Sequence, residues 1–124
     1  MNRIFLTAVL FLGLSITAIG QEKTKTAISK GATEVAKGKV DGNYFFTLPK
    51  GVSAATVEQN AKSYVMYFTV NYNEATQEAH ITMVTNDEKS RHVICRFLIS
   101  SGAEKISIDG KDMMLEEFFT TYLK

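Results

Sequence analysis

Cysteine is nearly absent from this chain of 124 residues, in which Cys95 is the only one. A single cysteine excludes an internal disulfide framework. It also excludes a lipid anchor on an N-terminal cysteine, because Cys95 lies far from the start of the chain. In an oxidising compartment a lone cysteine is buried and inert, paired with another chain, or reactive. We expect burial, because free cysteine behaves as a small hydrophobe.

Short catalytic motifs are absent as well. The sequence contains no nucleophile elbow, no Gly-rich phosphate loop, no HExxH and no CxxC. We therefore expect a protein without catalytic activity and without a cofactor, and keep a small enzyme of unknown class as an alternative.

Neither sign of charge dominates the chain. It carries 14 Lys and Arg residues against 13 Asp and Glu residues. Loss of an N-terminal segment that contains Arg3 leaves 13 against 13, a net charge of zero. A nucleic-acid-binding surface needs a basic excess on one face, so we expect no nucleic-acid partner.

A long apolar run occurs at the N-terminus. The positive charge of Arg3 precedes the run Ile4–Ile19, which contains no charged residue, and Ala18 and Gly20 place small side chains before Gln21. This is the pattern of a secretory signal peptide over residues 1–20, cleaved between Gly20 and Gln21. It predicts a periplasmic or secreted protein with no permanent membrane span after signal removal. An uncleaved anchor is the alternative, but the run is shorter than the about 20 residues that span a bilayer.

The next segment, residues 21–42, is predicted to be a polar tether. Its lysines are scattered among small residues, and it has little apolar surface to offset the entropy of ordering. A weak helix over residues 27–36, or a short hairpin at Asp41-Gly42, is the alternative. A single folded α+β domain is expected over residues 43–124.

Hydrophobic periodicity within residues 44–109 predicts the order strand, helix, strand, strand, helix, strand. The strands are expected over residues 44–48, 64–72, 78–85 and 103–109. Ser53 should cap the first helix, and Thr85 with Glu88 has the spacing of a capping box for the second. The inward stripe of the second helix is expected to be Val93, Ile94, Phe97, Leu98 and Ser101, which recur at helical spacing. A final amphipathic helix is expected after a cap at Asp112, with the apolar stripe Met114, Leu115, Phe118, Phe119, Tyr122 and Leu123.

This order of elements resembles the ferredoxin-like βαββαβ fold, a four-stranded antiparallel sheet with two helices on one face. It also resembles the heavy-metal-associated domains, whose first loop holds copper or zinc through two cysteines two residues apart. That resemblance implies the fold and, as an alternative function, metal handling. The matching loop over residues 48–56 reads Leu-Pro-Lys-Gly-Val-Ser-Ala-Ala-Thr and contains no Cys, His or Met, so no ligand is assigned there.

One face of such a sheet has no helix on it. We expect that face to carry an interaction surface, because exposed patches that include aromatic residues are usually binding sites. The C-terminal helix either covers this face, which we favour, or extends the helix layer and leaves the face for a second copy or a ligand. The residues expected to form the interaction surface are Tyr67, Thr69, His80 and Thr82. The same face is expected to carry Lys105 and Ser107, together with Val65, Val84 and Phe45.

His92 and Cys95 are weak candidates for a metal site. They are three residues apart on a predicted helix and share one side of it. Two ligands make an incomplete site, and the neighbouring Lys89, Arg91 and Arg96 would repel a cation. We therefore expect a solvated basic helix face beside a half-buried cysteine, with a Cys95-linked dimer as an alternative.

The sequence as a whole predicts an exported, non-catalytic binding or interaction module. Its partner would be an unknown protein, a small ligand or a second copy of the chain. The surface would be the open sheet face or the C-terminal helix.

Overall fold

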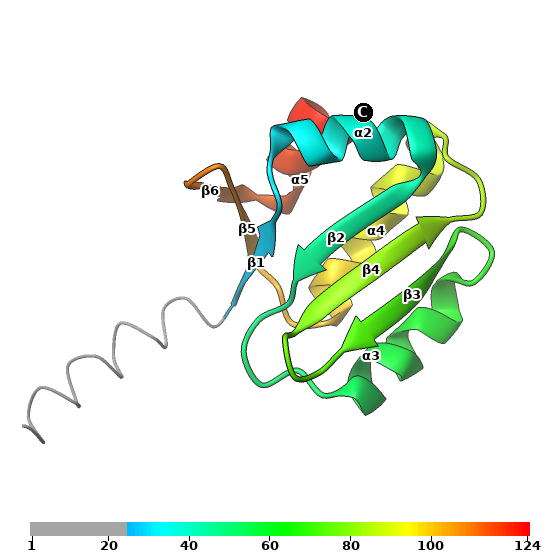
Figure 1. The fold of residues 1–124 in the computed structure, drawn as a ribbon, viewed down its shortest axis with the longest axis vertical. Helices are drawn as coiled ribbons and strands as arrows, with labels where there is room; N and C mark the ends of the chain where they lie inside the picture. The colour runs from blue at the N-terminus through cyan, green and yellow to red at the C-terminus, as the bar shows by residue number, and fades with distance from the viewer. Residues whose placement is uncertain (1–24) are drawn as a thin grey trace, which may run out of the picture.

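The computed structural model describes residues 25–124. The predicted signal peptide over residues 1–20 and its cleavage between Gly20 and Gln21 lie outside the described residues. Strands and helices both contribute, which confirms the predicted α+β class (Figure 1). The strands are β1 (Thr26–Ser29), β2 (Asn43–Thr47), β3 (Phe68–Asn73), β4 (Glu78–Met83), β5 (Lys105–Ile108) and β6 (Lys111–Met114). The helical segments are α2 (Ala32–Asp41), α3 (Ala54–Ala61), η1 (Lys62–Tyr64), α4 (Glu88–Ser100), α5 (Leu115–Phe118) and η2 (Phe119–Leu123).

The strands form one sheet in the order β3-β4-β2-β1-β5-β6. β1 and β5 run parallel, and the other neighbouring pairs are antiparallel. The prediction of a four-stranded antiparallel ferredoxin-like sheet is therefore wrong. The four strands on which it was based are present as β2, β3, β4 and β5, but β1 lies between β2 and β5, and β6 extends the sheet beyond β5.

Residues 26–41 belong to the fold, which corrects the predicted tether over residues 21–42. β1 is an inner strand, and α2 packs against β2 and η2. Composition misses β1 because its buried side chains, Ala27 and Ser29, are small, whereas its one large apolar residue, Ile28, is 51% exposed. Backbone hydrogen bonding to two neighbouring strands orders a segment that hydropathy alone does not.

The predicted helix caps and boundaries are partly confirmed. Ser53 caps α3 by accepting a hydrogen bond from the backbone N–H of Thr56. The cap of α4 is Asp87 rather than Thr85, and its Oδ1 accepts from the N–H of Ser90 at 2.8 Å. The strand predicted over residues 64–72 begins only at Phe68, because the residues before it form η1 and a turn.

The C-terminal segment begins as a strand rather than as a helix. β6 pairs with β5, so Asp112 lies in a strand and caps no helix. The helix starts at Leu115 and ends in the π-helical turn η2. Met114 is 56% exposed because, as the cross-strand partner of Lys105, it lies on the sheet face away from the core. Four residues of the predicted stripe are buried, namely Leu115, Phe118, Phe119 and Leu123.

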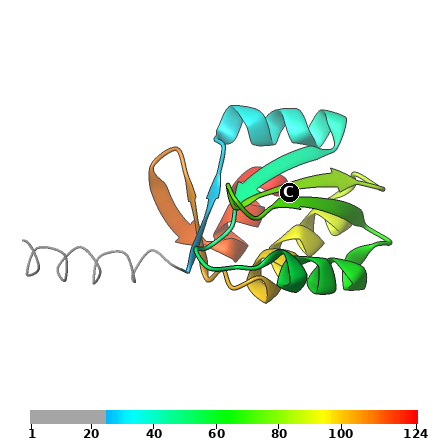
Figure 2. The same ribbon diagram turned by 60° about the horizontal axis from the view of Figure 1, so that its bottom comes forward.

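Three helical elements, α3, α4 and α5 with η2, pack on one face of the sheet; Figure 2 shows α3 and α4 on this side. Phe118 of α5 meets Phe46 of β2 edge-on, with ring centroids 6.1 Å apart. Phe97 of α4 meets Phe68 of β3 in the same way at 5.9 Å. The favoured expectation that the C-terminal helix covers the opposite sheet face is therefore wrong, because its apolar stripe is buried in the helix layer.

The predicted inward stripe of α4 is confirmed by the burial of Val93, Ile94, Phe97, Leu98 and Ser101.

Candidate open-face binding site

The sheet face opposite α3, α4 and α5 is the candidate site and is called the open face. Cross-strand partners share a face, so the register defines its members. His80 of β4 lies between Phe45 and Asn71, and Ile28 of β1 lies between Thr47 and Ser107. The open face contains Thr26, Ile28, Asn43, Phe45, Thr47, Thr69, Asn71, Asn73, Glu78, His80, Thr82, Lys105, Ser107, Asp112 and Met114.

The stacked rings of Phe45 and His80 form the centre of the open face. Their centroids are 4.3 Å apart and their planes are 16° from parallel. Asn43 Oδ1 lies 2.9 Å from His80 Nε2, within hydrogen-bond distance. On the side of β1, Lys30 Nζ lies 4.9 Å from the Phe45 centroid and forms an ion pair with Glu78 at 3.0 Å. These contacts hold the two stacked rings in place as a short aromatic ridge across β2 and β4.

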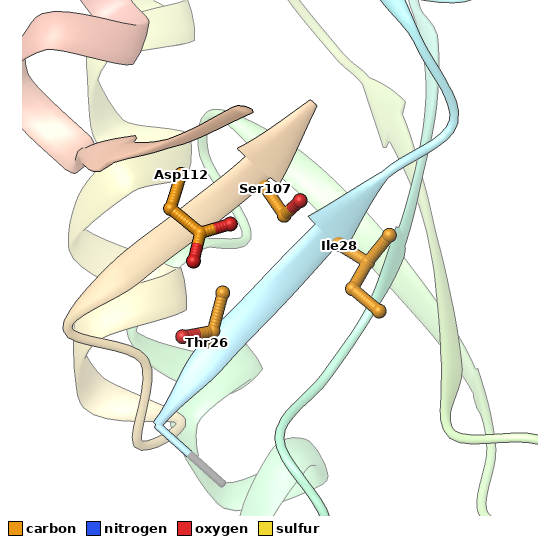
Figure 3. A pocket seen from close by; sticks show the side chains of 4 residues that line it. All are labelled: Thr26, Ile28, Ser107 and Asp112. Atoms are coloured by element: carbon orange, nitrogen blue, oxygen red, sulfur yellow. The ribbon is translucent and has the colours of Figure 1, made fainter. Parts of the chain in front are cut away.

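A shallow hollow lies beside this ridge, over β1, β5 and β6 (Figure 3). Its volume is about 100 Å³. Thr26 and Ile28 of β1 line one side, and Ser107 of β5 and Asp112 of β6 line the other. The two hydroxyls and the carboxylate can accept hydrogen bonds from a bound group. The aliphatic side chain of Ile28 can contact the carbon atoms of that group.

Charge on the open face is balanced. Lys30 is paired with Glu78. Lys105 and Asp112 lie on the same face, Lys105 two residues before Ser107 on β5 and Asp112 opposite Ser107 on β6. The remaining members are mostly threonine and asparagine, which offer both donors and acceptors. Such a surface suits an uncharged, hydrogen-bonding ligand better than a polyanion or a polycation.

Three of the four predicted surface residues lie on the open face. Thr69, His80 and Thr82 are brought together by the β3–β4 register. Tyr67 lies in the turn before β3, and its side chain is half-buried against the core. The cause is the late start of β3, because alternation places Tyr67 on this face only if the strand is extended there.

Sequence reasoning missed several members of the open face. Asn43 lies just outside the strand expected over residues 44–48, and Thr26 and Ile28 lie in the segment predicted to be a tether. Asp112 was predicted to be a helix cap. Only the short alternation of Thr26 and Ile28 with the small residues Ala27 and Ser29 could have indicated β1 from the sequence.

The structure places the weak metal candidates His92 and Cys95 in different environments. His92 Nε2 lies 2.7 Å from Glu116 Oε1, and its ring stacks on Phe119 at 4.0 Å. Cys95 is 2% exposed, with its Sγ 3.6 Å from the carbonyl oxygen of Leu115. Within residues 25–124, no group of three or more His, Cys, Asp and Glu side chains is arranged to hold a metal ion.

The two largest pKa shifts belong to groups on the helix side of the sheet rather than to the open face. Burial, with a smaller effect from Glu116, raises the pKa of the Cys95 thiol to about 12. Burial likewise raises the pKa of Tyr44 to about 12, although the nearby Arg91 charge opposes the change. Both groups are therefore protonated at neutral pH, and Cys95 is neither a nucleophile nor a ready thiolate ligand.

Comparison with family models, curated proteins and solved structures yielded no match to this chain. No helix in the part of the chain that the structure describes is long and apolar enough to cross a membrane.

Proposed function

We propose that this chain is an exported, non-catalytic module that binds a partner protein on its open face. The observation that carries the proposal is the Phe45–His80 stack, which stands on a sheet face that α3, α4 and α5 leave uncovered. Rigid aromatic side chains lose little conformational entropy when they are buried by a partner, so they make good anchors in protein interfaces.

The size of the hollow favours a protein over a small molecule. Small-molecule sites usually enclose about 300–1,000 Å³, whereas the hollow beside Ile28 measures about 100 Å³. One side chain of a partner would fill it. Asp112, Ser107 and Thr26 would accept hydrogen bonds from that side chain, and Ile28 would contact its carbon atoms.

The packing around Phe45 argues against a carbohydrate ligand. Sugars bind aromatic residues through the flat face of the ring. His80 stacks on Phe45 from the side of β4, and Lys30 approaches it from the side of β1. The ring edge, rather than a ring face, is therefore presented to solvent, as suits insertion between side chains of a protein partner.

The contacts of His80 support a binding role rather than a catalytic one. Its Nε2 lies near the Asn43 amide oxygen and the Thr82 hydroxyl. Glu78, the carboxylate on the same strand, is paired with Lys30. A general base is usually held by a carboxylate and faces a nucleophile, whereas an amide contact fixes the ring as part of a surface.

Site-specific photo-crosslinking in the producing organism tests this proposal. A photoreactive residue at Thr82, exposed on the open face, should yield an adduct of defined mass with one protein. The matched position is Thr120, an exposed threonine of η2 on the helix side. No adduct from Thr82, or the same adducts from both positions, would refute the proposal.

Binding of the purified adduct partner then provides a second measurement. Thr82→Arg places a bulky charge on the open face and should weaken binding at least about tenfold, or about 1.4 kcal/mol. Thr120→Arg introduces the same side chain elsewhere and should leave the affinity unchanged. Equal affinities for both variants would show that the partner binds another surface.

A further inference from the structure

β3 is an edge strand, and its free backbone groups can be assigned from the register. The N–H of Val84 donates to the carbonyl oxygen of Tyr67, one position beyond the Phe68–Met83 pair that begins the ladder. The Tyr67 N–H turns back to Tyr64, but the Val84 bond still marks this position as the hydrogen-bonded kind. Hydrogen-bonded and non-hydrogen-bonded pairs alternate along an antiparallel ladder. Thr69 and Asn71 therefore bond to β4, whereas the N–H and C=O groups of Phe68, Val70 and Tyr72 point out of the sheet.

An independent bond agrees with this assignment. Met83 is the cross-strand partner of Phe68, and its N–H donates to the carbonyl oxygen of Gly42 on the other side of β4. The backbone of Met83 therefore faces β2, as the alternation requires. Among residues 25–124 no other strand pairs with the outward groups of β3, so they can pair with a second chain.

β3 lacks the usual features that prevent strand addition. Natural edge strands carry charges, proline or bulges, or are very short. The sequence of β3, Phe-Thr-Val-Asn-Tyr-Asn, contains no charge and no proline and spans six residues. The other edge strand, β6, is shorter and carries Lys111 and Asp112. Only β3 is therefore suited to pairing.

We propose that two copies of the chain associate through antiparallel pairing of β3 with β3, about a two-fold axis at Val70. The centre of the strand is chemically symmetric around this residue. Val70 would face Val70 of the second copy, and Phe68 would exchange backbone hydrogen bonds with Tyr72. On the open face, the Thr69 hydroxyl would meet the Asn71 amide. No like charges are brought together by this register.

A hollow beside β3 fits the second copy. Its volume is about 330 Å³, and it is lined by Val70 and Thr69 of β3 and by Glu58, Ala61, Lys62 and Val65 of α3, η1 and the following turn. Paired residues of neighbouring strands point to the same face, so Val70 of the second copy would enter this apolar hollow. Val65, which is 58% exposed in one copy, would be covered.

Charges at the hollow favour a second copy over an unrelated strand. Glu58 and Lys62 both line it and lie one helical turn apart. A two-fold axis at Val70 places the two α3 helices antiparallel to each other. Glu58 of one copy then faces Lys62 of the other, and the reciprocal pair forms as well. This association is independent of the partner proposed for the open face, and would join the two open faces into one continuous sheet surface.

Amide hydrogen exchange combined with measurement of particle mass tests the proposal on the wild-type chain isolated from an exporting host. At high concentration the particle should have the mass of a dimer. The amides of Val70 and Tyr72 should exchange slowly in the dimer and at least about tenfold faster on dilution to monomer. Thr69 and Asn71 provide an internal control, because their amides bond to β4 and should stay protected in both states.

Two outcomes would overturn self-association. One is a monomer at every concentration. The other is protection of the Val70 amide in a monomer-sized particle, which would indicate a bound peptide of another protein.

Charge variants at the two-fold axis give a second test. Val70→Lys and Val70→Glu should each be monomeric, because like charges meet at the axis. Mixing the two variants should restore a dimer, because opposite charges then meet. The matched control is Val40→Lys on α2, where the side chain is 86% exposed; this variant should dimerise like the wild type. Dimers of Val70→Lys as stable as those of the wild type, or a folded mixture that stays monomeric, would overturn the proposed axis.

Discussion

Asp109 caps a helix that begins 77 residues earlier in the chain. Its Oδ2 accepts a hydrogen bond from the backbone N–H of Ala32 at 3.0 Å. The residue before α2 is Gly31, which has no side chain to supply this cap. The turn between β5 and β6 therefore satisfies a donor that the local sequence leaves free. This contact links the N-terminal segment to the C-terminal hairpin.

Asp109→Ala should lower the free energy of unfolding by about 1 kcal/mol, as loss of a helix cap usually does. Asp109→Asn is the matched control, because its side-chain oxygen still accepts and asparagine tolerates the observed φ of 52°. Urea denaturation of the three proteins measures the difference. Equal losses for both variants would show that the negative charge, rather than the hydrogen bond, matters.

Gly38→Ala should destabilise the protein by about 1–3 kcal/mol, as overpacking does. A Cβ at this position would lie 2.5 Å from the carbonyl oxygen of Asn43 and 2.6 Å from the Tyr44 ring. In a free helix the same change is stabilising by about 0.5–1 kcal/mol. The sign of the change in thermal stability therefore shows whether α2 is docked. Lys37→Ala, on the exposed side of α2, should change little.

Phe118→Ala should cost about 3–5 kcal/mol, the usual range for removing a buried aromatic ring. Phe118 is 0% exposed and packs on Phe46. Thr120→Ala, at an exposed position of η2, should stay within about 0.5 kcal/mol of the wild type. A loss below about 1 kcal/mol for Phe118→Ala, measured by chemical denaturation, would contradict docking of the C-terminal helix in the core.

Cys95 should resist alkylation in the folded protein at neutral pH. The side chain is 2% exposed, and burial raises the pKa of its thiol to about 12, so little thiolate is present. Mass spectrometry after iodoacetamide treatment should show one added group in denaturant and none without it. Rapid labelling of the native chain, or a disulfide-linked dimer, would contradict the buried position.

Stability should fall at alkaline pH through Tyr44. Its pKa is raised from 10.0 to about 12 in the folded state, so the folded protein holds the proton more tightly than the unfolded chain. This contribution is complete below pH 10 and is lost as the pH rises toward 12. Tyr44→Phe in a Cys95→Ala background should show a weaker pH dependence between these values than Cys95→Ala alone. Identical profiles would exclude Tyr44 as a source.

The element types between residues 43 and 108 could be predicted from the sequence because their signals are local. Strand β4 alternates, with Ala79 and Ile81 buried and His80 half-buried between them. The stripe of α4 recurs at helical spacing, and burial of Phe97 and Leu98 confirms it. Ser53 caps α3 as its position before the helix predicts.

Two features of the fold depend on pairing partners that local sequence patterns do not identify. β1 is ordered by β2 and β5, and its buried Ala27 and Ser29 are too small to show in hydropathy. Lys111–Met114 forms a strand because it pairs with β5. The sequence pattern alone predicts the start of a helix here, with Asp112 as its cap. In the candidate site, alternation along β3 and β4 predicts Thr69, His80 and Thr82, whereas Ile28 and Asp112 join the face only through the pairing of β1 and β6 with β5.

The sequence by itself determined the α+β class, the faces of β4 and α4, and the charge balance of the chain, because each follows from spacing or composition along one segment. The tertiary structure decided that residues 26–41 are part of the fold, that α5 packs on the helix side, and that the open face is uncovered. Those outcomes depend on which distant surfaces bury one another, as Phe118 and Phe46 do. Local periodicity shows that an apolar face needs a partner, but only packing in three dimensions selects it.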